Sequence, residues 1–419
     1  MAQELSIGTI SRQELDALSE THPLGNFQQT SYMIDLSSRR ADSYDIVGVR
    51  RDGEVVAGCF ISYLRGRMGL EGSIWCGPMC DFHDFELTAA LTEAIRRSAR
   101  GHGALSVSCW PDFVYQRHSS DGSCEGDADD VSFESLRRLG WRHGGFTVGY
   151  DSICNRWVYV KDLNGLADEK ALLESYTKYR RKNIRIARDS HVVVRALQRD
   201  EMSLFVELCA MSSQKQHFEG RSVDYYENLY DAFGDQVQFL VAELHLNDYI
   251  CECRRKLSQE QEVVDSICAK GDEASLSDKV RNRLEAKRKE VDGARRRIEE
   301  AERLIAEDGE VVPVGCIVYL RHARELVGLS AGNNDKYAKF YGSALLHHSI
   351  MVEGVERGIG RYNFYGITGN FDTDDPGYGV YDFKTRFNGF VEEMPGEFTL
   401  PVDKLRFGVK EFASKLLRR

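Results

Sequence analysis

A repeated segment constrains the fold of this chain more than any other feature. Residues 52–65 read DGEVVAGCFISYLR, and residues 308–321 read DGEVVPVGCIVYLR. Each copy has the pattern of a tight turn followed by a β-strand. In both halves a strand precedes the copy, and a helix and then another strand follow it. Two unrelated hairpins could match by chance, but the shared order of elements favours two copies of one α/β domain.

A long inserted segment leads into the second copy of the repeat. Residues 246–308 stand where the first half has only Arg51-Asp52-Gly53, and they contain no proline and 30 charged positions out of 63. Apolar side chains recur at heptad spacing on both sides of Gly271, with Glu260 and Lys287 as the charged exceptions. This pattern predicts an antiparallel coiled-coil arm in which Glu260 and Lys287 face each other.

Two roles fit such an arm. It is a dimerisation arm or spacer, or it docks RNA through basic triplets at residues 254–256, 287–289 and 295–297. The acidic residues between the triplets would make any phosphate-binding face narrow.

The overall charge narrows the search for a nucleic-acid site. The chain has 55 Lys and Arg against 66 Asp and Glu, a formal net charge of −11, so a polyanion must meet a local basic patch. Residues 176–188 form one, because eight of these thirteen positions are Lys, Arg or Tyr in a helix-like pattern. A solvated basic helix face is the alternative. The candidate RNA-binding residues are Lys178, Arg180, Arg181, Lys182 and Arg185.

Two further motifs carry groups that suit a binding or catalytic site. Arg221 and Tyr225 are four residues apart, so a helix would place them on one face, where they could clamp a diphosphate or a carboxylate. A surface pair with an aspartate is the alternative interpretation. Residues 377–393 combine glycines and aromatics with the pair Phe383-Lys384, which predicts an ammonium group beside an aromatic cavity wall.

Several function classes find no support in the sequence. The eleven cysteines include no CxxC pair, so neither a metal site nor a redox motif is expected. No Walker loop, Ser-His-Asp order or dinucleotide motif stands in a convincing context. No apolar run reaches the ~18 residues of a membrane span, and the N-terminus lacks the regions of a signal peptide. These features predict a soluble cytosolic protein.

Five motifs together resemble the Fem family of non-ribosomal peptidyltransferases, which use aminoacyl-tRNA to build the interpeptide bridge of bacterial peptidoglycan. They are Gly25-Asn-Phe-Gln-Gln-Thr, Tyr179-Arg-Arg-Lys-Asn-Ile-Arg-Ile-Ala, Gly220-Arg-Ser-Val-Asp-Tyr-Tyr, Val380-Tyr-Asp-Phe-Lys-Thr-Arg-Phe and Glu397-Phe-Thr-Leu-Pro-Val. The resemblance implies an α/β fold of two tandem acetyltransferase-like (GNAT) domains, with an antiparallel coiled-coil hairpin inserted in the second.

The expected domain organisation combines the repeat with this resemblance. The first domain covers residues 1–150. The second covers residues 151–245 and 309–400, with the arm at 246–308 between its two parts. Residues 401–419 are expected to form a C-terminal helix that packs back on the first domain.

The resemblance also implies roles for individual residues. Arg221 and Tyr225 correspond to a pair that contacts the nucleotide-linked or lipid-linked muropeptide. Lys384, with Phe383, corresponds to a lysine near the aminoacyl carbonyl. Two positions depart from the family pattern: Ser37 replaces a basic residue, with Arg39 and Arg40 just beyond it, and Trp110 replaces an aspartate. We therefore include Arg39 and Trp110 as candidate substrate contacts and Asp112 as the nearest candidate base.

The implied reaction is aminolysis of the aminoacyl-tRNA ester by the side-chain amine of a stem-peptide diamino acid, which needs neither a cofactor nor a metal. The implied partners are aminoacyl-tRNA, lipid II or UDP-MurNAc-pentapeptide, the inner face of the membrane, and other Fem-type transferases or a second copy. The expected location is cytoplasmic and peripheral to the membrane. Two alternatives stay open: an acyl-CoA-dependent N-acyltransferase on the same fold, and a non-enzymatic coiled-coil adaptor.

Overall fold

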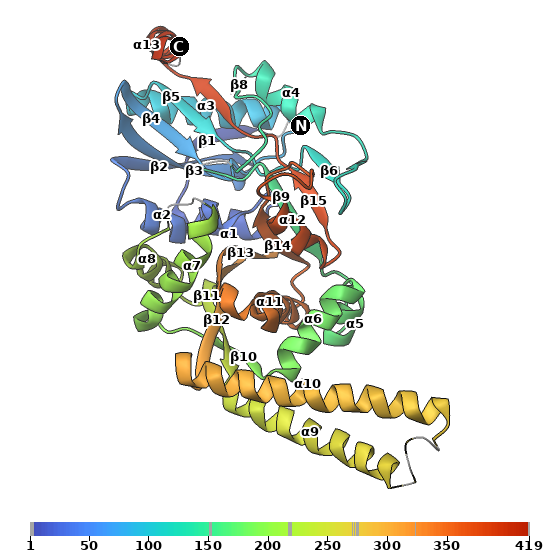
Figure 1. Ribbon diagram of the computed structural model, residues 1–419. Coiled ribbons are helices and arrows are strands. Elements are labelled where there is room, and N and C mark those ends of the chain that lie inside the picture. Colours follow the sequence, from blue (N-terminus) through green and yellow to red (C-terminus); the bar gives the residue numbers. More distant parts are fainter. Residues whose placement is uncertain are drawn as a thin grey trace.

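Two α/β units and a projecting pair of long helices make up the molecule (Figure 1). The computed structural model describes residues 4–150, 153–216, 220–269, 271, 273, 276–322 and 324–417. In these ranges, no helix is both long enough and apolar enough to cross a lipid bilayer.

The first unit is built on a sheet that has seven strands among the described residues, in the order β1-β2-β3-β4-β5-β16-β8. Helix α3 packs on one face, over Val47 and Cys59, and α1 packs on the other, over Ile46 and Phe60, because successive side chains of a strand point to opposite faces. The strands are β1 (Leu5–Thr9), β2 (Ser43–Arg51), β3 (Glu54–Gly66), β4 (Gly69–Ile74), β5 (Ser106–Cys109), β8 (Arg142–His143) and β16 (Phe398–Pro401). The helices are α1 (Arg12–Thr21), η1 (Phe27–Gln29), α2 (Ser31–Ser37), α3 (Phe85–Gly101), α4 (Asp130–Arg138) and α13 (Lys404–Leu417).

The second unit has a sheet of nine strands within the described ranges, in the order β10-β11-β12-β13-β14-β9-β15-β6-β7. Helix α11 packs on one face, over Ile317, and helices α7 and α8 pack on the other, over Val318. The strands are β6 (Gln116–His118), β7 (Cys124–Glu125), β9 (Trp157–Asp162), β10 (Val192–Ala196), β11 (Val237–His245), β12 (Val311–His322), β13 (Glu325–Asn333), β14 (Arg361–Gly366) and β15 (Phe390–Glu393). The helices are α5 (Glu169–Glu174), α6 (Lys178–Asp189), η2 (Arg199–Glu201), α7 (Met202–Gln216), α8 (Val223–Phe233), η3 (Gly234–Gln236), η5 (Asp335–Phe340), α11 (Gly342–Arg357) and α12 (Tyr378–Thr385).

The internal repeat corresponds to the same arrangement of elements in both units. In the first, β2, β3 and β4 are antiparallel and β4 is parallel to β5 after helix α3. In the second, β11, β12 and β13 are antiparallel and β13 is parallel to β14 after helix α11. The Gly-Cys pairs occupy equivalent places, with Cys59 and Cys316 fully buried on central strands. The predicted duplication is confirmed.

The two units exchange strands, which the expected domain boundaries do not show. Strand β16, from the end of the segment expected in the second domain, lies between β5 and β8 of the first sheet. Strands β6 and β7, from the segment expected in the first domain, extend the second sheet beside β15. Each exchange gives main-chain hydrogen-bond partners to an otherwise open strand edge. Both units are therefore assembled from distant parts of the chain.

The inserted segment forms the long helix pair α9 (Leu246–Cys268) and α10 (Asp278–Asp308). Its ends are adjacent, because His245 of β11 pairs with Val311 of β12, and Gly309 ends α10 with a φ of 91° that suits glycine. The Nζ atom of Lys287 lies 2.6 Å from Glu260 Oε2, which confirms the predicted pairing across the arm. The described buried residues of the arm are Leu246, Ile250, Cys253, Val264, Ile267, Leu284, Val291, Ala294, Ile298, Ala301 and Leu304.

Candidate functional site

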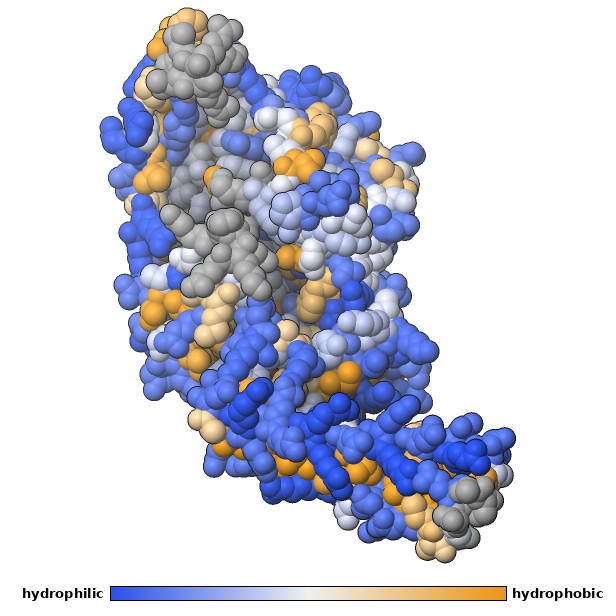
Figure 2. All heavy atoms as spheres, viewed as in Figure 1, coloured by the Kyte–Doolittle hydropathy of each residue, from blue (hydrophilic) through white to orange (hydrophobic). Residues whose placement is uncertain are grey.

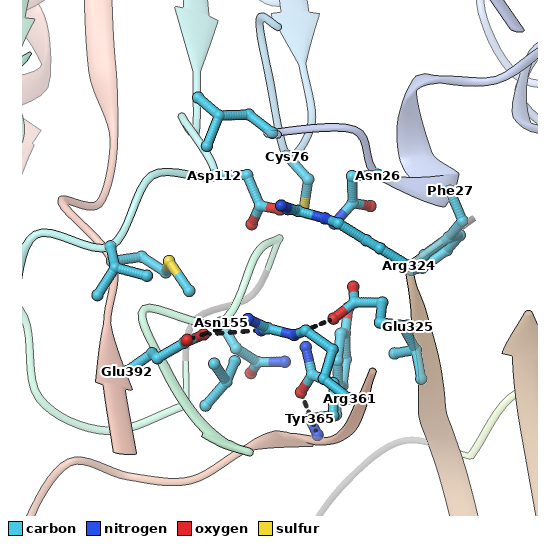
Figure 3. Close-up of a pocket in the computed structure, with 16 residues that line it drawn as sticks. Asn26, Phe27, Cys76, Asp112, Asn155, Arg324, Glu325, Arg361, Tyr365 and Glu392 are labelled. Carbon is cyan, nitrogen blue, oxygen red and sulfur yellow. Dashed lines mark hydrogen bonds and ion pairs between the residues drawn. The ribbon is translucent and has the colours of Figure 1, made fainter. Parts of the chain in front are cut away.

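A small cavity lies where the two units meet. It encloses about 100 Å³ and is lined by residues from η1, from the loops after β4 and β5, and from strands of the second sheet (Figure 3). The polar residues that line it are Asn26, Cys76, Asp112, Asn155, Arg324, Glu325, Arg361, Asn363, Tyr365 and Glu392. A reacting group held here would touch both units at once.

The motif that begins at Gly25 fixes the first-unit side of this cavity. Asn26 caps η1 by accepting a hydrogen bond from the backbone of Gln28 (3.0 Å), and its amide donates to Asp112 Oδ2 (2.9 Å). Gln29 is fully buried and donates to the carbonyl of Trp75 (2.7 Å), so it holds the loop that carries Cys76. Gln29 therefore has a structural role, whereas Asn26 contacts the candidate catalytic residue Asp112.

Asp112 is the carboxylate most suited to act as a base. Strand β5 ends at Cys109, and the chain is then tied to the β4 loop by a hydrogen bond from Gly77 N to the carbonyl of Trp110 (2.9 Å). Burial, and then the charge of Glu325, raise the pKa of Asp112 to about 7, against the lowering effect of Asn26. Trp110 itself is half-buried, and among the described residues the cavity wall includes Asp112 rather than Trp110.

An ion network forms the opposite wall of the cavity. Arg361 Nε lies 3.0 Å from Glu325 Oε2, and its two terminal nitrogens bind both oxygens of Glu392 at 3.1 and 2.8 Å (Figure 3). Both carboxylates are buried, with only 3% and 5% of each residue exposed. Burial alone would lower the pKa of Arg361, but the two carboxylates outweigh it and raise that pKa. The network keeps a negative charge close to Asp112.

Lys384 lies behind the cavity wall, on helix α12. Its side chain is buried, and Nζ donates to the backbone carbonyls of Tyr365 (3.2 Å) and Gly366 (2.6 Å). These carbonyls are turned toward it where the pairing of β14 with β9 shifts register, and Tyr365 there has a φ of 64°. Burial lowers the pKa of Lys384 to about 7. Because the side chain of Tyr365 lines the cavity, this ammonium is one residue removed from it.

Phe383 and Arg180 form one packed group beside Lys384. The guanidinium of Arg180 lies over the rings of Phe383 and Phe387, at 4.3 and 4.1 Å from their centroids, and donates to the carbonyl of Phe383 (2.6 Å). Arg180 is only 1% exposed. The expectation that Arg180 contacts RNA is therefore wrong for this conformation, because the side chain is used to fix α6 against α12.

The other four basic residues expected to bind RNA lie on the outside of α6. They are Lys178, Arg181, Lys182 and Arg185, and all four are exposed. Arg181 also donates to the carbonyls of Glu174 and Tyr176, at 3.0 and 2.8 Å, which stabilises the start of the helix.

A second basic group forms where helix α8 of the second unit meets the loop after α2 of the first. The guanidiniums of Arg221 and Arg40 lie 5.3 and 5.9 Å from the ring centroid of Tyr225, and Arg39 donates to the side chain of Asn228. We call these residues (Arg39, Arg40, Arg221 and Tyr225) the arginine cluster. All three arginines are exposed, and the cluster stands at the N-terminus of α8, whose dipole favours anions.

Tyr365 connects the arginine cluster with the cavity. Burial raises the pKa of its hydroxyl, and the nearby Cys76, Cys154, Tyr225 and Asp112 raise it further. Tyr365 lines the same cavity as Asp112, and it packs against the same apolar cluster as Tyr225. Tyr365 therefore belongs both to the cavity wall and to the apolar packing below the arginine cluster.

The ion network is the part of the site that the sequence motifs miss. A partial signal is present, because Glu325 and Arg361 each begin a strand that has no other charged residue. Glu392 gives a weaker signal, since it stands beside Glu393 in β15. Buried charges of opposite sign usually form pairs. Only the strand order shows that these three meet.

The two GNAT-like units, the helical hairpin in the second unit and a site that both units line define a tandem acetyltransferase-like protein. The crystal structure of FemX is similar over 96% of this chain and 99% of that chain, with a TM-score of 0.79 at 20% identity, which confirms the predicted fold class. The chain is 29% identical over 377 residues to aminoacyltransferase FemB of Staphylococcus epidermidis, covering 89% of each, and 25% identical over 417 residues to FemA of that organism, covering 97% of this chain and 98% of FemA.

The model of the FemAB family matches residues 10–415, and the chain belongs to this family. The resemblance that the sequence motifs indicate is thereby confirmed.

Proposed function

We infer that this chain, a FemAB-family aminoacyltransferase of peptidoglycan interpeptide-bridge synthesis, takes its aminoacyl group from aminoacyl-tRNA and delivers it to the side-chain amine of a stem-peptide diamino acid. The acceptor is a lipid-linked or UDP-linked precursor. The observation that carries the proposal is the cavity between the two units, in which Asp112 meets Tyr365, the residue whose carbonyl binds Lys384. Such substrates would place the reaction at the cytoplasmic side of the membrane.

The acceptor amine needs a base. With an ordinary pKa near 10.4, about 1 in 2,500 amines is neutral at pH 7, which corresponds to roughly 4.6 kcal/mol. Asp112 has a pKa of about 7 and faces the cavity, so near neutral pH a large part of it is ionised. It would accept the amine proton as the new amide bond forms, and return it to the ribose oxygen of the tRNA as the ester bond breaks.

The tetrahedral intermediate needs a cation near its oxygen. An ammonium has three N–H donors, and Lys384 directs two of them to the carbonyls of Tyr365 and Gly366. We assign the third to the developing oxyanion of the aminoacyl carbonyl, which the bound substrate must bring past Tyr365 to reach Nζ. Phe383 and Arg180 would hold α12, and with it Lys384, in place.

The substrates would approach from different sides. The arginine cluster suits the diphosphate or a carboxylate of the acceptor, since guanidinium groups bind such anions through paired hydrogen bonds. The exposed basic residues of α6 suit the tRNA backbone. The direct test is to incubate the protein with lipid II and a mixture of charged tRNAs, and to measure the product mass. An acceptor that gains no aminoacyl residue would contradict the proposal.

Arg221 tests the acceptor side. Arg221→Ala is expected to raise the KM for the acceptor by about 30- to 150-fold, because one charged hydrogen-bond partner contributes about 2–3 kcal/mol, while the KM for aminoacyl-tRNA stays unchanged. Arg67→Ala, which removes another exposed arginine in the turn after β3, is the control and should change neither constant. An equal rise in both KM values would argue for a folding role instead.

The helical arm tests the tRNA side. Several of its basic residues are already paired within the arm, as Arg254 is with Glu302, Arg255 with Glu252 and Arg288 with Glu273. We expect replacement of residues 246–308 by a short Asp-Gly turn to leave a folded protein, because the arm's ends are adjacent strand residues. Its stability should be lower than that of the wild type, because the base of the arm packs in the core of the second unit. Its tRNA affinity should fall and depend less steeply on salt, since phosphate contacts are lost.

Binding assays at several salt concentrations, with the oligomeric state measured in parallel, decide the role of the arm. Unchanged tRNA affinity and salt slope with a changed oligomeric state would make the arm an oligomerisation device. The exposed residues of α6 would then be the main tRNA contacts.

A further inference from the structure

Helix α13 exposes three of its described apolar side chains to solvent. Leu405, Val409 and Phe412 are 85%, 63% and 67% exposed, and they lie four and three residues apart along the helix. This spacing places all three on one face. We call them the apolar stripe. Figure 2 shows apolar side chains beside the grey atoms at the end of the molecule where Figure 1 places α13.

The orientation of this helix is fixed by contacts on its other face. Phe407 is buried below the guanidinium of Arg142, which lies 5.3 Å from its ring centroid. Glu411 pairs with Arg142 at 2.7 Å, and Lys410 pairs with Glu71 of β4 at 2.5 Å. A surface helix ordinarily buries its apolar stripe and exposes its charges. In α13 only Phe407 of the described apolar side chains is buried, and the face opposite to it exposes the apolar stripe.

A basic groove begins beside the same helix. It has a volume of about 1200 Å³ and runs between α3, α4, β8 and the start of α13. The charged groups that line it, among the described residues, are six basic and two acidic ones. The basic residues are Arg96, Arg100, Arg137, Arg138, Arg142 and Lys404. Three of them pair with carboxylates, Arg96 with Glu93, Arg137 with Glu134 and Arg142 with Glu411. The other three leave a local excess of positive charge in a chain whose net charge is −11.

We propose that the apolar stripe and the basic groove form a docking surface for a membrane rich in anionic lipids. The stripe enters the boundary between headgroups and acyl chains, and the groove binds the lipid phosphates. An amphipathic helix with a basic surround binds membranes through this combination. The inference rests on the proposed function to the extent that a lipid-linked acceptor gives the enzyme a reason to stay at the membrane.

Two other occupants fit the surface less well. For a second copy of this chain, the apolar part of the surface is small: a helix of this length covers roughly 200 Å², against the ~800 Å² per partner of a stable dimer interface. The phosphate backbone of RNA could fill the basic groove, but it would leave the apolar stripe exposed. The lipid surface alone matches both the charge and the apolar side chains.

The test is sedimentation of the full-length protein with vesicles, without substrates. Wild-type protein is expected to bind phosphatidylglycerol vesicles and not phosphatidylcholine vesicles. The double variant Leu405→Asp/Phe412→Asp should bind the anionic vesicles at least ten-fold more weakly. The control Val193→Asp/Val311→Asp, which replaces two exposed valines of the second unit, should bind as the wild type does.

A second pair of variants tests the groove. Arg100→Glu/Arg137→Glu should weaken vesicle binding at least ten-fold, whereas Arg295→Glu/Arg296→Glu, with the same charge change on the arm, should not. Equal binding by the stripe variant and the wild type would overturn the proposal. So would a wild-type dimer that the stripe variant disrupts while vesicle binding stays the same, or groove variants that lose only RNA binding.

Activity assays separate this inference from the proposed function. The stripe variant should transfer the aminoacyl group to a water-soluble UDP-linked acceptor as the wild type does, and lose activity only on acceptors embedded in vesicles. Wild-type protein that binds vesicles but transfers nothing to any acceptor would contradict the proposed function and leave the docking surface standing.

Discussion

Asp112→Asn is expected to lower the turnover of aminoacyl transfer by about 10²- to 10⁴-fold, the range that one general base contributes. The asparagine can still accept the hydrogen bond from Asn26, so the loop after β5 keeps its place. Turnover measured with saturating tRNA and acceptor checks the prediction. A variant with wild-type turnover would remove Asp112 from the mechanism.

The stability of this variant provides an internal control. The fold raises the pKa of Asp112 from 3.8 to about 7, so it favours the protonated form, and ionisation reduces the free energy of unfolding as the pH rises from about 4 through 7. Asparagine does not ionise. Asp112→Asn should therefore unfold at a higher temperature than the wild type at pH 8, and the difference should vanish near pH 4. Lower activity together with higher stability cannot be explained by misfolding.

The neighbouring carboxylate should set the pH at which the base becomes active. Glu325 raises the pKa of Asp112 through its charge. In Glu325→Gln, Arg361 keeps its two hydrogen bonds to Glu392, and the acid limb of the rate profile should shift to lower pH. If the acid limb of Glu325→Gln lies at the same pH as that of the wild type, ionisation of Asp112 does not control the acid limb.

Lys384→Met is expected to lower turnover by about 10²- to 10³-fold, the usual loss for one group that stabilises an oxyanion. Methionine fills a similar volume, and burial of the charged form is already unfavourable, as the lowered pKa shows. The fold should therefore be retained, which thermal unfolding would verify. The matched control is Lys161→Met, because Lys161 is also buried and donates to a backbone carbonyl, that of Asn388, at 3.0 Å. Equal loss in both variants would indicate a packing role.

The two groups together predict a narrow pH optimum. Asp112 must be ionised and Lys384 protonated, and both have a pKa of about 7. The wild-type rate should therefore be highest near neutral pH, and should fall at both lower and higher pH. The acid limb should disappear in Asp112→Asn and the alkaline limb in Lys384→Met.

The sequence predicts those parts of the structure that depend on local pattern. The duplicated unit follows from a repeated turn and strand, and the arm follows from heptad spacing, including the contact between Glu260 and Lys287. Arg221 does lie beside Tyr225, but not through a shared helix face, because Arg221 precedes Ser222, the N-cap residue of α8. The structure also places Arg39 and Arg40 in this group.

Other parts depend on contacts between distant segments and could not be predicted in this way. Arg180 looks like an exposed member of a basic helix until Phe383 and Phe387, some two hundred residues later, are seen to enclose it. Glu325, Arg361 and Glu392 lie on three strands whose order no local pattern reveals. Strand β16 has only four residues, too few for a periodic signal.

The position of β16 has a consequence for how the protein is made. Cys109 of β5 pairs with Phe398, about 290 residues later in the chain. During synthesis, the first sheet therefore lacks an internal strand until residues 398–401 have left the ribosome. Until then the sheet has an open strand edge, which must not pair with other chains and aggregate. Neither unit can therefore fold completely before the other. The cavity between them is completed in the same late step that closes both sheets, so a nascent chain holds no finished site that could act on its substrates too early.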